Sequence, residues 1–276
     1  MKITACYCIF NETENIVRSL DSVRLCDRVV VLDGAWEQYP HTRMDGMSDD
    51  GTVEKVIQWM IGWEGEGFLV LPKIPWPNQR DKRSFYFRFG ESGDCFLVID
   101  GDEIVESGME ELRSWLGKIE VDAVRVREVV QKNPTNPNLS VVRYPGLSPR
   151  LIRFKSGLVY GRTYDKISGI SSEISSDKLT MRHLRYDPIR SPERRRVKSE
   201  NQTSEAFAAG ITVGKADGRT AGTQVRLIHW CPNLRYWPDQ ANYESGLFSW
   251  NLGDDFPISP VVLHHVNRIS SHSDIR

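Results

Sequence analysis

The chain has 276 residues, of which 39% are hydrophobic, and its formal net charge is −1. This length and composition suffice for one large or two small globular domains. A nearly neutral chain has no overall field that would attract nucleic acid or an anionic membrane, and no apolar run approaches the length of a membrane span. We therefore expect no nucleic-acid partner and no membrane span, while peripheral membrane association stays open.

The N-terminal pattern and the cysteines indicate the compartment. Met1 leads directly into a strand pattern, without the basic and apolar regions of a targeting signal. The cysteines are odd in number and Cys-x-Cys is not zinc spacing; they are Cys6, Cys8, Cys26, Cys95 and Cys231. We expect reduced thiols in the core of a cytoplasmic protein.

The first elements form a strand–helix–strand unit. Residues 3–10 are a continuous apolar strand, and Asn11-Glu12 is expected to open a helix with Asn11 or Thr13 as its cap. A second apolar strand, residues 28–32, ends at Asp33-Gly34. Continuous apolar strands separated by a helix are typical of a parallel sheet.

The most informative stretch is an apolar run, residues 96–99, followed by Asp100, Asp102 and Glu103. Open α/β sheets bind ligands at the carboxyl ends of their strands. Two aspartates on either side of a glycine can offer hard oxygen ligands to Mg²⁺ or Mn²⁺, with substrate phosphates completing the shell. The alternative is a turn capped by acids, and Glu103 either supports the ligands or simply begins the next turn.

Periodicity predicts the remaining elements. Ahead of the acidic run we expect a helix from Asp49 to about Trp59, a strand at 68–71, a helix at 81–89 and a strand at 95–99. Beyond it we expect a helix at 110–116, strands at 121–130, 150–154 and 157–160, a mobile Ser-rich loop at 166–178, strands at 179–184 and 225–230, and a helix at 191–209. The polar tail, residues 269–276, is expected to be frayed.

One set of motifs runs along the chain: Asn11-Glu12, Asp33-Gly34, Ser48-Asp-Asp-Gly-Thr52, Lys82-Arg83, Val98-Ile-Asp-Gly-Asp-Glu103, Pro149-Arg-Leu-Ile-Arg153 and Met181-Arg-His-Leu184. In these motifs the chain resembles glycosyltransferase family 2. The resemblance implies a GT-A-like, Rossmann-type α/β fold, with a mixed, mainly parallel sheet flanked by helices. Residues 1–105 would form the donor-binding half, and residues 106–268 a mixed acceptor-side half of the same domain.

The resemblance also implies a reaction. It is the metal-dependent transfer of a sugar from a nucleoside diphosphate donor to a hydroxyl of a carbohydrate or glycoconjugate, with inversion, and a UDP-sugar is the first donor to try. A nucleotidyltransferase is a competing hypothesis, but the segment after the first strand, Asn11 to Glu14, is acidic and lacks glycine. A degenerate nucleotide- or carbohydrate-binding module is the third.

The family pattern assigns roles on the donor side. Asp102 would bind Mn²⁺ or Mg²⁺ directly, and Asp100 would contact the metal shell or the donor ribose. Asp33 would accept from the base or ribose. In addition, Asn11 and Glu12 would meet the diphosphate or base, and the cations Lys82 and Arg83 would lie near the diphosphate.

Acceptor-side roles rest on weaker matches. Asp165 is the candidate general base, because an inverting transfer needs one carboxylate to take the acceptor proton; Glu173 and Asp187 are alternatives. His183 is the candidate third metal ligand. Its competitors are His229, His264 and His265. Arg190 and Arg194–Arg196 could contact the diphosphate or an anionic acceptor.

Overall fold

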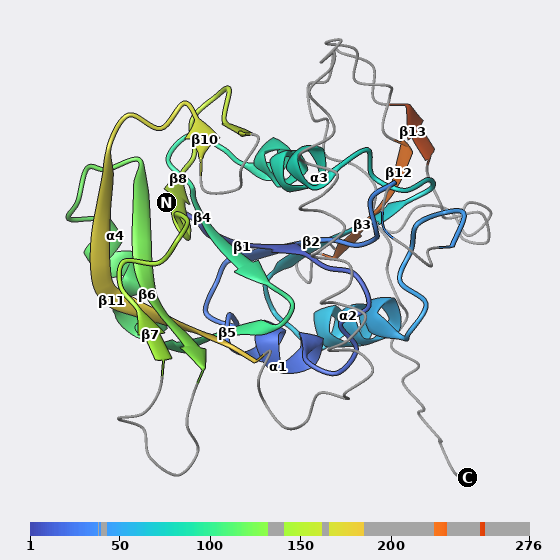
Figure 1. Cartoon of the computed structure of the whole chain (residues 1–276), viewed down its shortest axis with the longest axis horizontal. Coiled ribbons are helices and arrows are strands. Elements are labelled where there is room, and N and C mark those ends of the chain that lie inside the picture. The colour runs from blue at the N-terminus through green and yellow to red at the C-terminus, as the bar shows by residue number, and fades with distance from the viewer. Residues whose placement is uncertain are drawn as a thin grey trace, which may run out of the picture.

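A mixed β-sheet with helices on both faces organises the chain (Figure 1). The computed structural model describes residues 1–37, 39, 43–131, 141–161, 166–184, 224–230 and 249–251. Within them the strand order is β13-β12-β3-β2-β1-β4-β8-β6-β11-β5, with β7 beside β6 and a separate β10-β9 pair. The predicted α/β fold class, with a mixed sheet flanked by helices, is confirmed.

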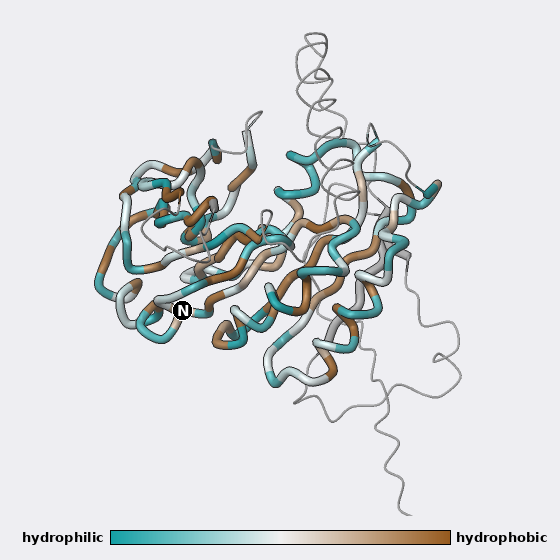
Figure 2. Tube along the Cα trace, turned by 60° about the horizontal axis from the view of Figure 1, so that its bottom comes forward, coloured by the Kyte–Doolittle hydropathy of each residue, from teal (hydrophilic) through white to brown (hydrophobic). Residues whose placement is uncertain are grey.

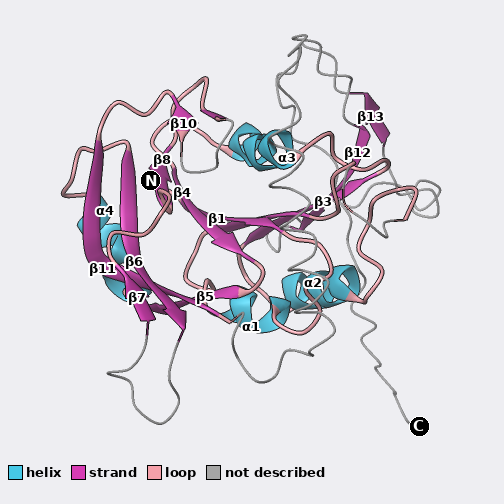
Figure 3. Cartoon of the chain, in the orientation of Figure 1, coloured by secondary structure: helices cyan, strands magenta, loops and turns pink. Residues whose placement is uncertain are grey.

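The elements alternate in the first half and become mainly β in the second (Figure 3). The strands are β1 Ile3–Cys8, β2 Arg28–Leu32, β3 Glu66–Pro72, β4 Cys95–Asp100, β5 Glu103–Ser107, β6 Ala123–Gln131, β7 Val141–Arg143, β8 Leu151–Arg153, β9 Val159–Tyr160, β10 Ile167–Ser168, β11 Glu173–His183, β12 Gln224–Trp230 and β13 Ser249–Asn251. The helices are α1 Ile16–Asp21, α2 Thr52–Ile61, α3 Gln79–Phe85, the 3-10 helix η1 Tyr86–Phe89, and α4 Met109–Leu116.

Strands β3, β2, β1 and β4 are the parallel part of the sheet. Because they run the same way, their carboxyl ends meet at one edge. On one side β12 and β13 continue antiparallel. On the other, β8 joins β4 to β6 antiparallel, and β11 lies parallel to β6 and antiparallel to β5. The parallel strands therefore position the ends at which the sequence predicts ligands.

Both faces of the parallel strands are apolar, as continuous hydrophobic runs require. On β1, Ala5 and Tyr7 face a core shared with α1 and α2, whereas Cys6 faces a core shared with Trp76, Tyr86 and Phe87. Figure 1 shows α1 and α2 on one side of the sheet and α3 on the other. The hydrophobic colour in Figure 2 follows these central strands. None of the helices among the described residues has the length and apolar character to cross a membrane.

Two local predictions were wrong, and one strand beside the acidic turn had not been predicted. Helix α1 begins at Ile16 with Asn15 as its N-cap residue, so Asn11 and Thr13 do not cap it; Asn11 instead adopts a left-handed conformation with φ 54°, which asparagine tolerates. Strand β5 was not foreseen. Strand β11 begins at Glu173 and takes in much of the Ser-rich stretch, because pairing with β6 satisfies its backbone.

Two predicted segments, the helix at 191–209 and the tail at 269–276, lie outside the described residues. The boundary between donor and acceptor halves at residue 105 stays a prediction.

Candidate functional site

The carboxyl ends of β1, β2 and β4 bring the sequence-predicted donor-side residues to one edge of the sheet. In the strand register, Cys8 lies opposite Leu32 on one side and opposite Asp100 on the other. Asp33 follows Leu32 directly, so Asp33 and Asp100 flank the segment that continues from β1 to Asn11. The strand topology brings these ends to one edge of the sheet, whereas the ligand roles stay predictions.

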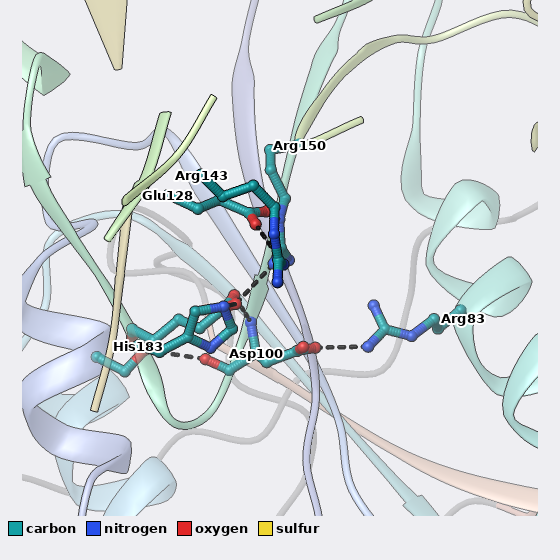
Figure 4. Close-up of polar contacts among 8 residues, drawn as sticks. Arg83, Asp100, Glu128, Arg143, Arg150 and His183 are labelled. Carbon is teal, nitrogen blue, oxygen red and sulfur yellow. Dashed lines mark hydrogen bonds and ion pairs between the residues drawn. The ribbon is translucent and has the colours of Figure 1, made fainter. Parts of the chain in front are cut away.

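Asp100 is paired with Arg83, which lies in the last turn of α3. Arg83 Nη2 donates to Asp100 Oδ1 at 2.6 Å, and the Asp100 side chain is 30% exposed. Figure 4 shows the Asp100 carboxylate and the Arg83 guanidinium pointing toward each other. A guanidinium at this place can also meet a diphosphate, since it carries several donors in a fixed fork.

Lys82, the residue before Arg83, is enclosed by protein and only 1% exposed. Its ammonium donates to the carbonyl oxygens of Ile9, at 2.7 Å, and of Gly34. Burial lowers the pKa of Lys82 to about 8. Lys82 thus joins the segments that follow β1 and β2, and its nitrogen contacts the backbone of the site rather than an open cleft. Its predicted contact with the diphosphate would require this arrangement to change.

The carboxylate of Asp33 is fully buried and bound to Ser48. Ser48 Oγ donates to Oδ1 at 2.6 Å, and the Ser48 backbone N–H donates to Oδ2 at 2.9 Å. Burial raises the pKa of Asp33, an effect that Lys82 opposes. Asp33 therefore anchors the returning chain at Ser48, and its predicted contact with a base or ribose stays a prediction.

The residues after Ser48 hold the segment that follows β1. Asn11 N–H donates to Ser48 Oγ at 2.8 Å, and Asn11 Oδ1 accepts from Asp49 N–H at 3.0 Å. Glu12 N–H donates to Thr52 Oγ1 at 2.7 Å. The motif Ser48–Thr52 therefore acts as a clamp that fixes the conformation of Asn11 and Glu12, although it follows β2 after a long insertion.

Gly101 allows this clamped segment to approach the acidic turn. A Cβ added at Gly101 would lie 2.9 Å from both Glu12 Cγ and Ile9 Cγ2, closer than side-chain atoms can pack. Only glycine therefore fits between Asp100 and Asp102 without displacing Glu12. Asp102 itself is buried, at 5% exposure, and its carbonyl oxygen accepts from Leu184 N–H at 2.6 Å.

Glu103 is the central acceptor of the site, although the sequence left its role open. Its carboxylate accepts from the Asp100 backbone N–H at 2.9 Å and from Arg150 Nη2 at 2.6 Å, and it contacts His183 Nε2 at 3.0 Å. Arg150 Nε also donates to Glu128 Oε1 at 3.0 Å. Burial raises the pKa of Glu103, and the Arg150 guanidinium opposes that shift.

The candidate ligands of a divalent cation are the two aspartates of the acidic turn. Asp100 and Asp102, with only Gly101 between them, supply hard oxygens, which fits Mg²⁺ or Mn²⁺ shared with a substrate diphosphate, because such ions need only one or two protein carboxylates. His183 Nε2 contacts Glu103 at 3.0 Å, so only Nδ1 of that ring could serve a cation, and its role as a third ligand stays a prediction. Among the described residues, no three His, Cys, Asp or Glu side chains are arranged to hold a metal ion by themselves.

Several acceptor-side predictions cannot be placed. Asp165 lies outside the described residues, as do Asp187, His264, His265, Arg190 and Arg194–Arg196. His229 lies in β12. Glu173 is described: it begins β11 and is paired with Arg125 at 2.5 Å. The sequence did not predict that Ser48 binds Asp33 or that Arg150 binds Glu103, although both residues lie in motifs that carry the family resemblance.

No protein-family model matches the chain, and no curated protein matches it in sequence. Solved structures with a similar arrangement include S. aureus TarS 1-349 in complex with UDP-GlcNAc, at 13% identity and a TM-score of 0.46, covering 74% of this chain and 66% of that chain.

Two further similar structures are a mannosyltransferase and a nucleotide transferase. Mannosyltransferase PcManGT from Pyrobaculum calidifontis, in complex with GDP-Man and Mn²⁺, has 17% identity and a TM-score of 0.47, covering 79% of this chain and 66% of that chain. The inositol-1-phosphate CTP transferase from T. maritima has 11% identity and a TM-score of 0.33, covering 73% of this chain and 96% of that chain. The chain spans less than two thirds of the TarS and PcManGT chains, and 47% of a second TarS 1-349 structure.

Proposed function

We propose that this protein is a metal-dependent glycosyltransferase that moves a sugar from a nucleoside diphosphate donor to a hydroxyl of a carbohydrate or glycoconjugate. One observation carries the proposal. The acidic turn Asp100–Asp102 lies at the end of β4, beside the clamped segment of Asn11 and Glu12 and facing the guanidinium of Arg83. Carboxylates for a cation and a guanidinium for phosphate oxygens, at the carboxyl edge of a parallel sheet, suit a nucleoside diphosphate.

The residues of the chain would divide the work. Asp102 and Asp100 would hold Mn²⁺ or Mg²⁺, which when bound neutralises charge on the departing diphosphate. Arg83 would orient the diphosphate through its guanidinium, in addition to the cation. Asp165 would accept the proton of the acceptor hydroxyl as its oxygen bonds to the anomeric carbon and the bond from that carbon to the diphosphate breaks. One displacement of this kind inverts the anomeric centre. A UDP-sugar is the first donor to test, and the cytoplasm is the proposed location.

The direct test combines a donor panel with two variants. UDP-, GDP- and CMP-sugars are incubated with the protein and Mn²⁺, and release of the nucleotide is measured with and without candidate acceptors. Asp102→Asn should lower Mn²⁺-dependent release by orders of magnitude, because it removes a charged ligand. Asp165→Asn should keep donor and Mn²⁺ affinity and lower transfer by about 10²–10⁴-fold, the contribution of a general base.

Asp21→Asn is a matched control, since Asp21 lies in α1 with a side chain that is 49% exposed. Its activity should equal that of the wild type. Near-normal Mn²⁺-dependent turnover in Asp102→Asn would refute the metal assignment. Release of pyrophosphate from a nucleoside triphosphate and a sugar phosphate would instead identify a nucleotidyltransferase.

A further inference from the structure

Glu103 connects the acidic turn to strand β11. One carboxylate oxygen, Oε2, accepts from the backbone N–H of Asp100 at 2.9 Å. The other, Oε1, accepts from Arg150 Nη2 at 2.6 Å and lies 3.0 Å from His183 Nε2. The strand register agrees, because His183 is directly opposite Glu103 in the β5–β11 pair. A single carboxylate therefore contacts the backbone of one predicted ligand and the ring of another.

Arg150 is held in place from its other side. Its Nε donates to Glu128 Oε1 at 3.0 Å, and Arg143, whose side chain is 40% exposed, lies 3.5 Å from Glu128 Oε2. Glu103, Arg150 and Glu128 are all buried. Figure 4 shows Arg143 and Arg150 converging on Glu128, with His183 and Asp100 below them. A buried carboxylate keeps its charge only when it is paired, and Arg150 supplies that pairing to Glu103.

The contacts of Glu103 require a carboxylate. Two hydrogen-bond donors, the Asp100 N–H and Arg150 Nη2, share its oxygens with the His183 ring, whose Nε2 lies 3.0 Å away. A glutamine side chain offers instead one acceptor oxygen and an NH₂ group that only donates. If the amide oxygen faced Arg150 and His183, the NH₂ group would oppose the N–H of Asp100. If the amide were turned over, its NH₂ group would face Arg150 and His183 instead. In either orientation one side of the arrangement is lost.

We propose that Glu103, held by Arg150, is a positioning residue that sets the conformation of the Asp100–Asp102 turn and the orientation of the His183 ring at the same time. The consequence for a bound cation rests on the proposed function; the positioning of the ring does not. With Nε2 facing the carboxylate, the proton of neutral His183 lies on Nε2. The Nδ1 atom is then left as the acceptor, whether toward a cation or toward a substrate hydroxyl.

The position of the His183 ring proton can be tested in the metal-free protein by NMR. A ring proton bound to a buried carboxylate exchanges slowly with water, so a direct ¹H–¹⁵N signal of His183 Nε2 should be visible with ¹⁵N-histidine labelling and should vanish in His183→Gln. It should weaken or disappear in Glu103→Gln. The signal should persist in Glu128→Gln, the matched control. This variant also takes one carboxylate partner from Arg150, but Glu128 is not the residue that contacts His183.

The turn is tested separately by titrating Mn²⁺ with UDP present. Loss of a residue that orients metal ligands typically lowers metal affinity by about 10–100-fold. We expect a loss of that size for Glu103→Gln and about threefold or less for Glu128→Gln.

The two readouts separate the positioning role from the proposed function. A wild-type signal on Nδ1–H would overturn the positioning role whatever the variants do. Equal effects of the two glutamine variants, with both still folded, would overturn it as well. Absence of Mn²⁺ binding by the wild type would refute the proposed function, and the ring signal would still decide how His183 is held.

Discussion

Replacing Lys82 by methionine should destabilise the protein strongly, although lysine is ordinarily a surface residue. Methionine keeps the length and most of the apolar stem of the side chain, so the change removes mainly the ammonium. In the structure that ammonium is 1% exposed and donates to the carbonyl oxygens of Ile9 and Gly34. It also opposes the effect of burial on the pKa of Asp33.

The magnitude follows from the contacts that are lost. A hydrogen bond from a charged donor contributes about 1.5–3 kcal/mol, and the carbonyls that remain are buried without that donor. Two such bonds amount to about 3–6 kcal/mol. Methionine avoids the cost of burying a charge, so we expect the lower part of this range, about 3 kcal/mol. Because whole domains are stable by only about 5–15 kcal/mol, the loss should be large enough to measure easily.

Urea denaturation followed by tryptophan fluorescence and circular dichroism gives the free energy of unfolding of each variant. Lys55→Met is the matched control, since Lys55 is exposed and donates to one backbone oxygen, that of Thr13, at 2.8 Å. The control should change stability by about 0.5 kcal/mol or less, as surface substitutions do. If Lys82→Met costs less than about 1 kcal/mol, or no more than the control, the structural role of the buried ammonium is wrong.

Two further predictions concern carboxylates that the structure places in specific hydrogen bonds. Asp33→Ala and Ser48→Ala should each weaken UDP binding by about 1–3 kcal/mol, because each breaks the connection that leads to Asn11; calorimetry that finds the loss only in Asp33→Ala would show that Asp33 contacts the nucleotide itself. For Asp122, hydrogen bonds from Lys155 and Ser171 lower the pKa below its ordinary value of 3.8. The ionised carboxylate therefore stabilises the fold above that pH, and its contribution is lost as the pH falls further. The difference in unfolding free energy between wild type and Asp122→Asn should shrink below about pH 4, and a difference that stays constant down to pH 2 would contradict this reasoning.

Patterns within single segments determined most of the first half of the fold. The apolar runs of β1, β2 and β4 predict parallel strands, because only strands covered on both faces are apolar throughout. Each run is followed by polar residues, and parallel strands bring those residues to one edge. The approach of Asn11, Asp33 and Asp100 to that edge could therefore be predicted without knowing any side-chain contact.

The sequence could not show which polar groups form hydrogen bonds or ion pairs within the protein. Lys82 and Arg83 are adjacent cations in the same helix, yet Lys82 binds backbone carbonyls while Arg83 pairs with Asp100. Helix periodicity places both residues but does not say how deeply each is buried. Only the packing of α3 against the sheet decides that difference.

Long-range pairing decided the rest of the site. Ser48 meets Asp33 across an insertion, and Arg150 meets Glu103 although 47 residues separate them. Local propensity carries no information about such partners, because each depends on the order and register of strands in the assembled sheet. The sequence by itself determined a parallel sheet with an acidic turn at its carboxyl edge. The sequence left Glu103 between two roles. The tertiary structure decided that its carboxylate contacts Asp100, Arg150 and His183, because only the folded sheet brings β4, β5 and β11 together.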